Sequence, residues 1–204
     1  IIADNIQDDH ILVSIGVKGN SLGLGLDKIG VSLGENNHII VNENGQTNIE
    51  IIYAVGDVIG PPWLAHVSAA EGLYVAEYIA NLHPKKIDYN CIPACTYSKP
   101  EVASIGMTKK QLDKEGIEYN TAKSFFNSNG KAVATGETDG FIKIYVGSDN
   151  LILGAHIIGS NATEMISEFS LAMRNQLSVE NILDTIHPHP TFSEAIFETL
   201  MQLK

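Results

Sequence analysis

Hydrophobic and polar residues in the second half of the chain alternate in short blocks that predict a mixed α and β structure. Apolar runs with the two-residue period of strands are separated by turn sequences such as Asp139-Gly140. The predicted strands cover residues 97–105, 118–126, 130–137, 141–146 and 151–158. This pattern predicts an α+β domain from residue 87 to residue 204.

Two helices are predicted within this domain. Thr108 and Gln111 have the spacing of a capping box and Gly116 is a C-terminal stop, which predicts a short helix over 108–116. Residues 162–176 predict a second helix, because apolar side chains recur there at helical spacing. Its apolar stripe consists of Met165, Ile166, Phe169 and Met173. A stripe of this kind is usually core, but it also suits a helix at a subunit interface.

The first 86 residues carry a sparser pattern. Short strands are predicted at 10–16, 39–41 and 51–55, and an amphipathic helix at 67–82. One face of that helix consists of Ala70, Leu73, Ala76 and Ala80. The sequence His-Pro-Lys-Lys at 83–86 is the predicted linker, so a domain boundary is expected after residue 86.

The most distinctive segment is His-Pro-His-Pro-Thr-Phe-Ser-Glu, from His187 to Glu194. Each proline disfavours the α conformation in the residue before it, so both histidines are expected to be extended. Thr191 and Glu194 have capping-box spacing, which predicts a helix start that folds Glu194 back towards His189. A carboxylate on one ring nitrogen makes the other a better base, suited to taking a proton from a thiol.

Two simpler interpretations of this segment stay open on spacing alone. A Thr-x-x-Glu pattern is most often only a helix cap. A His-x-His pair also occurs in zinc sites, but zinc needs three or four ligands. The chain has only two cysteines, Cys91 and Cys95, and both lie far back in the sequence. We therefore predict no metal site.

A second candidate site follows the apolar run Ile-Ile-Tyr-Ala-Val-Gly-Asp at 51–57. In α/β folds a strand of this kind delivers its last residue, here Asp57, to the edge where ligands bind. Pro-Pro-Trp-Leu-Ala-His follows at 61–66 and leads into the predicted helix. A buried strand followed by a plain turn is the structural alternative.

Taken together, these segments resemble the pyridine nucleotide–disulfide oxidoreductase family, and within it the dihydrolipoyl dehydrogenase branch. The C-terminal signature of that branch is similar to His-x-His-Pro-Thr-x-Ser-Glu-Ala here, with Phe192 where leucine is common. The resemblance implies that His189 is the acid/base residue and that Glu194 orients it. His187 favours the lipoamide enzymes over the glutathione reductases.

The same resemblance implies which residues meet the cofactors FAD and NAD. Asp57 would bond the ribityl chain of FAD, and Gly16 would approach NAD. The segment that would open a helix facing the flavin consists of Trp63, Leu64, Ala65 and His66. In the family this glycine usually begins the sequence Gly-Arg-x-Pro-Asn, whereas the sequence here is Gly-Val-Lys-Gly-Asn, without the arginine and the proline.

The implied domains are the end of the NAD-binding domain at 1–19, the C-terminal part of an α/β FAD-binding region at 20–86, and the interface domain at 87–204. In the family the interface domain is an antiparallel sheet covered by helices. It assembles a homodimer in which the histidine reaches the disulfide and flavin of the other subunit.

Other family features are missing from the sequence. No Gly-x-Gly-x-x-Gly motif is present, and Cys91-Ile-Pro-Ala-Cys95 has the wrong spacing for the redox-active pair. We interpret both cysteines as ordinary thiols and the chain as the C-terminal part of an enzyme. Tight FAD binding is therefore not expected for this fragment alone.

Composition narrows the function classes. The chain has 204 residues, is 44% hydrophobic and carries a net charge of −11, which disfavours binding to nucleic acid or anionic membranes. It has no membrane-length apolar run and no signal-peptide pattern. A cytoplasmic location or, as second choice, the mitochondrial matrix is expected.

The resemblance implies a parent enzyme that oxidises protein-bound dihydrolipoamide with NAD, through a redox disulfide and FAD. Its expected partners are a second copy of itself and the lipoyl domains of 2-oxoacid dehydrogenase or glycine cleavage complexes. Two alternatives remain: a related disulfide reductase of the glutathione or mercuric type, or a catalytically silent dimerisation module.

Overall fold

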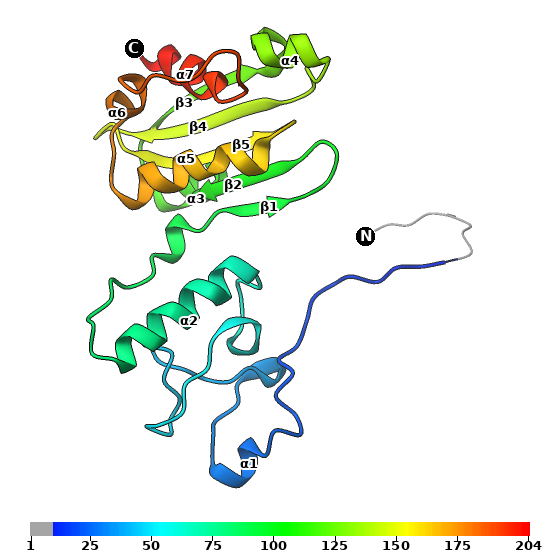
Figure 1. Ribbon diagram of the computed structural model, residues 1–204, viewed down its shortest axis with the longest axis vertical. Helices are drawn as coiled ribbons and strands as arrows, with labels where there is room; N and C mark the ends of the chain where they lie inside the picture. The colour runs from blue at the N-terminus through cyan, green and yellow to red at the C-terminus, as the bar shows by residue number, and fades with distance from the viewer. Residues whose placement is uncertain (1–9) are drawn as a thin grey trace. The chain divides into compact units, whose positions relative to one another are not determined.

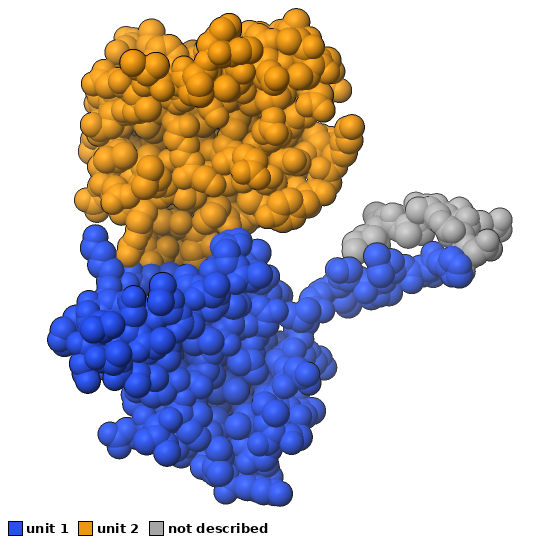
Figure 2. Space-filling view, in the orientation of Figure 1, with its two compact units in different colours: residues 1–87 blue, residues 88–204 orange. Residues whose placement is uncertain are grey.

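The computed structural model describes residues 10–204, and the chain divides into two compact units, residues 1–87 and 88–204 (Figure 2). The second unit contains a single five-stranded sheet in the order β1-β2-β5-β4-β3, with every neighbouring pair antiparallel (Figure 1). The strands are β1 (Ala94–Thr96), β2 (Val102–Gly106), β3 (Tyr119–Phe125), β4 (Phe141–Gly147) and β5 (Ile152–Ile158). This arrangement confirms the predicted α+β class for this part of the chain.

The second unit also contains five α-helices, and all of them except the first contribute buried side chains to one hydrophobic cluster with the sheet. They are α3 (Lys109–Glu115), α4 (Gly130–Thr135), α5 (Ala162–Arg174), α6 (Val179–Leu183) and α7 (Glu194–Leu200). Helix α5 packs on β2 and β5, and α7 packs on β3 and β4. Alternate strand residues such as Ile105, Ile144 and Ile157 are buried in one hydrophobic cluster with Phe169 and Ile196 of those helices. Removing these apolar surfaces from water is the main stabilising contribution to the unit.

The apolar stripe of α5 belongs to this intramolecular core. Met165, Ile166 and Phe169 are buried within the single chain, and Met173 packs against the same cluster. The same holds for Ala195, Ile196 and Leu200 of α7. A dimer interface inferred from this stripe is therefore wrong for these residues, because their own sheet already covers them.

Local capping signals explain the short helices. The capping box at Thr108 is confirmed: its side chain accepts from the Gln111 backbone N–H, and Gly116 ends α3 in the left-handed conformation. The strand predicted at 130–137 is wrong, since α4 forms there instead. Asn129 caps α4 by accepting from the Ala132 N–H, and Gly136 ends it.

The strand predicted at 97–105 forms only in its second half, as β2 from Val102, and β1 ends before the predicted range begins. Residues 97–101 form the turn that joins β1 to β2. Pro100 has no backbone N–H to donate to a sheet, so the apolar run is interrupted there.

The first unit has little regular structure in its described part. It contains α1 (Leu26–Ile29), the short 3₁₀ turns η1 (Glu35–Asn37) and η2 (Gly56–Ile59), and α2 (Ala65–Ile79). The strands predicted at 39–41 and 51–55 are reduced to isolated bridges, Leu33 to Ile39 and Gln46 to Tyr53. Residues 10–16 form no strand, because no described segment lies beside them to complete a hydrogen-bonded ladder.

Helix α2 confirms the helix predicted at 67–82 but buries a different face. Val67, Glu71 and Val75 are buried, whereas Leu73 of the predicted apolar face is 62% exposed. The buried face packs on η2, the turn that carries Asp57.

Candidate active site

His189 and Glu194 form the hydrogen-bonded pair that their spacing predicts. His189 lies in the loop between α6 and α7, and its Nδ1 is 2.8 Å from Oε1 of Glu194. An ionised carboxylate can only accept, so Nδ1 carries the proton and Nε2 keeps a lone pair. The His189 side chain is 76% exposed. No described residue forms a hydrogen bond with Nε2, so this nitrogen can receive a proton from an incoming molecule.

Glu194 is held in place by the backbone as well as by the histidine. It is the first residue of α7, and its Oε2 accepts from the Thr191 backbone N–H at 2.8 Å. This backbone bond, followed by the bond to His189, lowers the pKa of Glu194 below its ordinary value. The carboxylate therefore remains ionised and available to stabilise a positive charge on the imidazole.

Only half of the predicted capping box at Thr191 forms. The Glu194 side chain reaches back to the Thr191 N–H, but the Thr191 hydroxyl donates to the Pro188 carbonyl at 2.7 Å. Ser193, not Thr191, precedes the first helical residue. The prediction that Thr191 is the N-cap is wrong, because its hydroxyl bonds the Pro188 carbonyl instead of a backbone N–H of the helix.

His187 has a different environment from His189, although the two are only two residues apart. Its side chain is 7% exposed, its Nδ1 is 3.1 Å from the Thr185 carbonyl oxygen, and its Nε2 is 2.9 Å from Oε1 of Glu168 on α5. Both nitrogens are engaged, so His187 has no lone pair for a reacting group. The structure thus separates a free histidine from a fixed one.

Helix α4 supports the loop from the other side. Asn129 is 1% exposed, and its Nδ2 donates to the Thr191 carbonyl at 3.1 Å. Gly130, the residue after Asn129, lies next to the loop, since a Cβ added to it would lie 4.0 Å from Cε1 of His189. Phe192 is buried against Phe126, with ring centroids 5.6 Å apart. Sequence analysis missed Asn129, although an asparagine before an Ala-rich segment that ends in glycine is an N-cap signal.

Two hollows flank this loop. One has a volume of about 420 Å³ and is lined in part by His187, Glu194, Phe197 and Glu198. Burial, followed by the nearby charge of Glu194, raises the pKa of Glu198. The other hollow, about 310 Å³, includes Pro190 and Lys131 among its lining residues.

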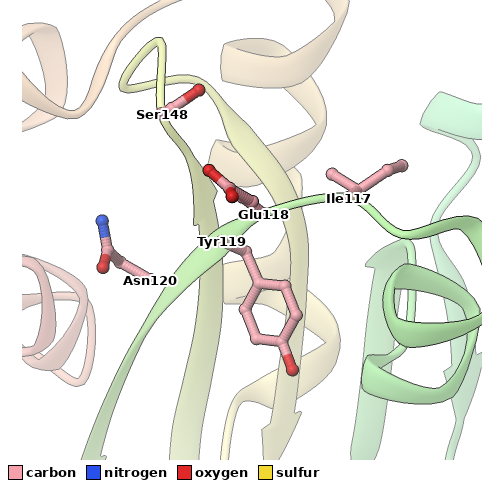
Figure 3. Close-up of a pocket in the computed structure, with 5 residues that line it drawn as sticks. All are labelled: Ile117, Glu118, Tyr119, Asn120 and Ser148. Carbon is pink, nitrogen blue, oxygen red and sulfur yellow. The ribbon is translucent and has the colours of Figure 1, made fainter.

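A further hollow lies away from the histidines, at the end of β3. It has a volume of about 390 Å³ and is lined by Ile117, Glu118, Tyr119, Asn120 and Ser148 (Figure 3). It holds a single carboxylate and no histidine or cysteine, so it lacks an acid/base pair. Of these hollows, only those beside the loop between α6 and α7 adjoin the candidate acid/base groups.

In the first unit, Asp57 lies in the turn η2, which a hydrogen bond to Glu71 of α2 holds in place. Gly56 is buried with a φ of 75°, and its N–H donates to Oε2 of the buried Glu71 at 2.7 Å. A Cβ on Gly56 would lie 2.8 Å from Oγ of Ser68, so only glycine fits. Asp57 itself is exposed, and its carboxylate forms no hydrogen bond with the described residues. Sequence analysis missed Glu71, because a charged residue on a helix is normally expected to face water.

The other predicted cofactor residues fall in two places. Trp63 and Leu64 directly precede α2, and Ala65 and His66 are its first residues; no side chain caps this helix N-terminus. The structure therefore brings this segment and Asp57 to the same small unit. Gly16 lies in the extended segment before α1, and a Cβ there would meet nothing within 4 Å. The structure does not bring Gly16 together with the other predicted residues.

Both cysteines are free thiols. Cys91 donates to Asp88 at 3.3 Å, and burial together with this carboxylate raises the pKa of the thiol to about 11. Burial also raises the pKa of Cys95. A thiol with a raised pKa is a poor nucleophile, so neither is suited to disulfide exchange. Within residues 10–204 no group of three or more potential metal ligands occurs, and no helix there has the length and apolarity needed to cross a membrane.

Two family models match most of the chain. Residues 92–200 match the dimerisation domain of the pyridine nucleotide-disulphide oxidoreductases, and residues 3–72 match the pyridine nucleotide-disulphide oxidoreductase model.

Curated relatives are similar along nearly the whole chain. It is 40% identical to a dihydrolipoyl dehydrogenase of Zymomonas mobilis and 42% identical to a mitochondrial one of Caenorhabditis elegans, each over 194 residues. These alignments cover 94% and 95% of this chain but only 41% and 39% of the relatives. The chain thus spans about two fifths of the length of these relatives.

Solved structures agree on the fold. LpdA from Mycobacterium tuberculosis superposes with a TM-score of 0.90 at 28% identity, covering 96% of this chain and 43% of that one. The HOCl-induced flavoprotein disulfide reductase RclA from Escherichia coli superposes with a TM-score of 0.84 over 92% of this chain and 43% of its own. At 22% identity, the second match shows the fold alone.

Proposed function

The chain belongs to the pyridine nucleotide-disulphide oxidoreductase family, and on that premise we propose that it supplies the acid/base half of a dihydrolipoyl dehydrogenase active site. The observation that carries this proposal is the His189–Glu194 pair, with Nδ1 fixed at 2.8 Å from the carboxylate and Nε2 exposed. His187 cannot take this role, since both of its nitrogens are occupied.

In the proposed reaction, Nε2 of His189 accepts the proton of a dihydrolipoamide thiol. The positive charge that forms on the ring is stabilised by Glu194, which stays ionised because the Thr191 N–H and His189 lower its pKa. The resulting thiolate is the nucleophile in thiol–disulfide exchange. The disulfide it attacks is not Cys91 with Cys95, since the pKa of each thiol is raised. It would come from a part of the enzyme outside this sequence.

The first unit offers one wall for a flavin. The Asp57 carboxylate has no hydrogen-bond partner among the described residues, so it is available to a sugar-like hydroxyl. The segment from Trp63 to His66 opens α2, whose N-terminus lacks a side-chain cap and presents the positive end of the helix dipole. These donors and acceptors fit FAD. When bound, FAD would accept two electrons from the dithiol that forms when the substrate reduces the disulfide, and would pass them to NAD.

We also propose that the enzyme is a homodimer and that its natural substrate is the lipoyl group of a carrier domain. The match of residues 92–200 to a dimerisation domain supports the dimer. The names of the curated relatives support the lipoyl substrate. The cytoplasmic or mitochondrial location remains a prediction.

A steady-state assay of the complete enzyme tests this proposal. Oxidation of dihydrolipoamide with NAD should be rapid, and His189→Gln should slow it by a factor of about 10² or more. Faster turnover with glutathione disulfide or mercuric ion than with lipoamide would instead support a related reductase. Near-normal lipoamide turnover by His189→Gln would remove His189 from the mechanism.

A further inference from the structure

Two hydrogen bonds and a ring contact constrain the side chain of His187 in the loop between α6 and α7. Its ring lies between the Thr185 carbonyl and the Glu168 carboxylate, and it also contacts the Phe197 ring, with centroids 6.2 Å apart. Glu168 lies on α5, so this bond joins the loop to the helix that packs across β2 and β5. The loop is thus attached at residue 187 to a helix that packs on the central strands of the sheet.

The two hydrogen bonds together determine the protonation of the ring. A carbonyl oxygen and an ionised carboxylate both lack a proton to donate, so each needs an N–H from the histidine. A neutral imidazole has only one N–H, and therefore only the doubly protonated ring makes both bonds at once. The carboxylates around it suit a cation: Glu168 on α5 bonds it, and Asp184, Glu194 and Glu198 line the same hollow.

We propose that His187 is a positioning residue, held as an imidazolium that clamps the His189 loop to α5 through Glu168. The clamp is a property of this chain; its effect on catalysis rests on the proposed function. Only Pro188 separates the clamped ring from His189, and the Thr191 hydroxyl fixes the Pro188 carbonyl at 2.7 Å. Fixing a catalytic group in its reactive geometry before substrate arrives lowers the entropic cost of reaction.

The clamp also accounts for the different environments of two histidines so close in sequence. His187 uses both nitrogens for structure, while His189 uses one and exposes the other. Replacing His187 should therefore leave the chemistry of His189 intact but lower the fraction of time it spends correctly placed. The expected result is a loss in kcat of about 10-fold, with little change in KM, because the clamp itself touches no substrate.

Nitrogen-15 NMR of the histidine rings in the 204-residue chain tests the clamp directly and needs no activity. At pH 7, both ring nitrogens of His187 should carry protons, because each lies against an acceptor. Glu168→Ala should abolish the doubly protonated signature, whereas Ser167→Ala, at the exposed neighbour of Glu168 on α5, should leave it unchanged. A singly protonated His187 in the parent chain would overturn the proposal, whether or not the variants fold.

Kinetics of the complete enzyme test the consequence. Glu168→Ala should lower kcat about 10-fold. Glu168→Gln should recover part of that loss, since a carboxamide oxygen can still accept from Nε2. Ser167→Ala should match the parent enzyme. Equal kcat values for Glu168→Ala and Ser167→Ala would overturn the positioning role. Failure of the proposed function would look different, since it would appear as near-normal turnover in His189→Gln.

Discussion

Replacing Asn129 by alanine should weaken both the start of α4 and the support of the His189 loop. Asn129 is 1% exposed, and its two side-chain ends have separate partners: Oδ1 accepts from the Ala132 N–H at 3.0 Å, and Nδ2 donates to the Thr191 carbonyl at 3.1 Å. Alanine removes both bonds at once.

The two losses can be estimated separately. Losing an N-cap costs about 1 kcal/mol. Losing the bond to Thr191, which is only partly buried, costs about 1–2 kcal/mol, because water can replace the lost donor only in part. Asn129→Ala should therefore lower the free energy of unfolding by about 2–3 kcal/mol. Asn129→Ser keeps a good cap but does not reach Thr191, so its loss should be about 1 kcal/mol smaller.

Urea unfolding of the chain, followed in two ways, measures these values. Far-UV circular dichroism follows the helices and the sheet, while the fluorescence of Trp63, the only tryptophan, reports on the first unit alone. The dichroism midpoint should fall for Asn129→Ala with an unchanged slope, and the fluorescence midpoint should stay constant. A loss below about 0.5 kcal/mol for Asn129→Ala would refute this account of the loop support.

Three other outcomes are expected. Cys91 should react with iodoacetamide at pH 8 more than ~100-fold more slowly than free cysteine, because its pKa is raised to about 11. Mass spectrometry of the folded and the urea-unfolded chain measures the labelling, and rapid labelling of the folded chain would contradict the partly buried, carboxylate-paired environment of this thiol. Because the folded-state pKa of Glu194 is lowered, its stabilisation is fully present above the ordinary value of 4.5 and is lost as the pH falls through the lowered value. The difference in unfolding free energy between the parent chain and Glu194→Gln should thus be largest at neutral pH and should disappear in acid. A difference that does not depend on pH would argue against the ionised pair. Gly56→Ala should destabilise the first unit by at least about 1–2 kcal/mol, because of the positive φ and the contact with Ser68. Gly72→Ala in α2, where an added Cβ meets nothing within 4 Å, should instead stabilise the unit by up to about 1 kcal/mol. Thermal unfolding followed by Trp63 fluorescence compares the two variants, and equal midpoints would contradict this expectation.

Local signals in the sequence predicted the elements whose ends are determined by neighbouring residues. The capping box at Thr108, the strands β3, β4 and β5, and the helix α5 all follow from patterns within a few residues. The His189–Glu194 bond was predicted for the same reason, since five residues across a proline leave the two side chains few other arrangements. The catalytic role of this pair stays a prediction.

Features that depend on distant residues could not be predicted in this way. Glu168 lies 19 positions before His187, and Asn129 lies 62 positions before Thr191, so neither contact leaves a pattern in the local sequence. The predicted strand at 130–137 failed because alternating Ala and Val suit either element, and the cap at Asn129 decided in favour of a helix. The segment at 10–16 has the composition of a strand but no described neighbour with which to pair.

The central claim is that His189 moves the substrate proton, and stopped-flow mixing of the complete enzyme with dihydrolipoamide tests it most directly. The account predicts that His189→Gln slows the flavin absorbance change on mixing with dihydrolipoamide by a factor of about 10² or more, because thiolate formation loses its base. The change on mixing with NADH should keep nearly the parent rate, since no substrate thiol is deprotonated in that direction. A reduction by dihydrolipoamide as fast as in the parent enzyme would contradict the account.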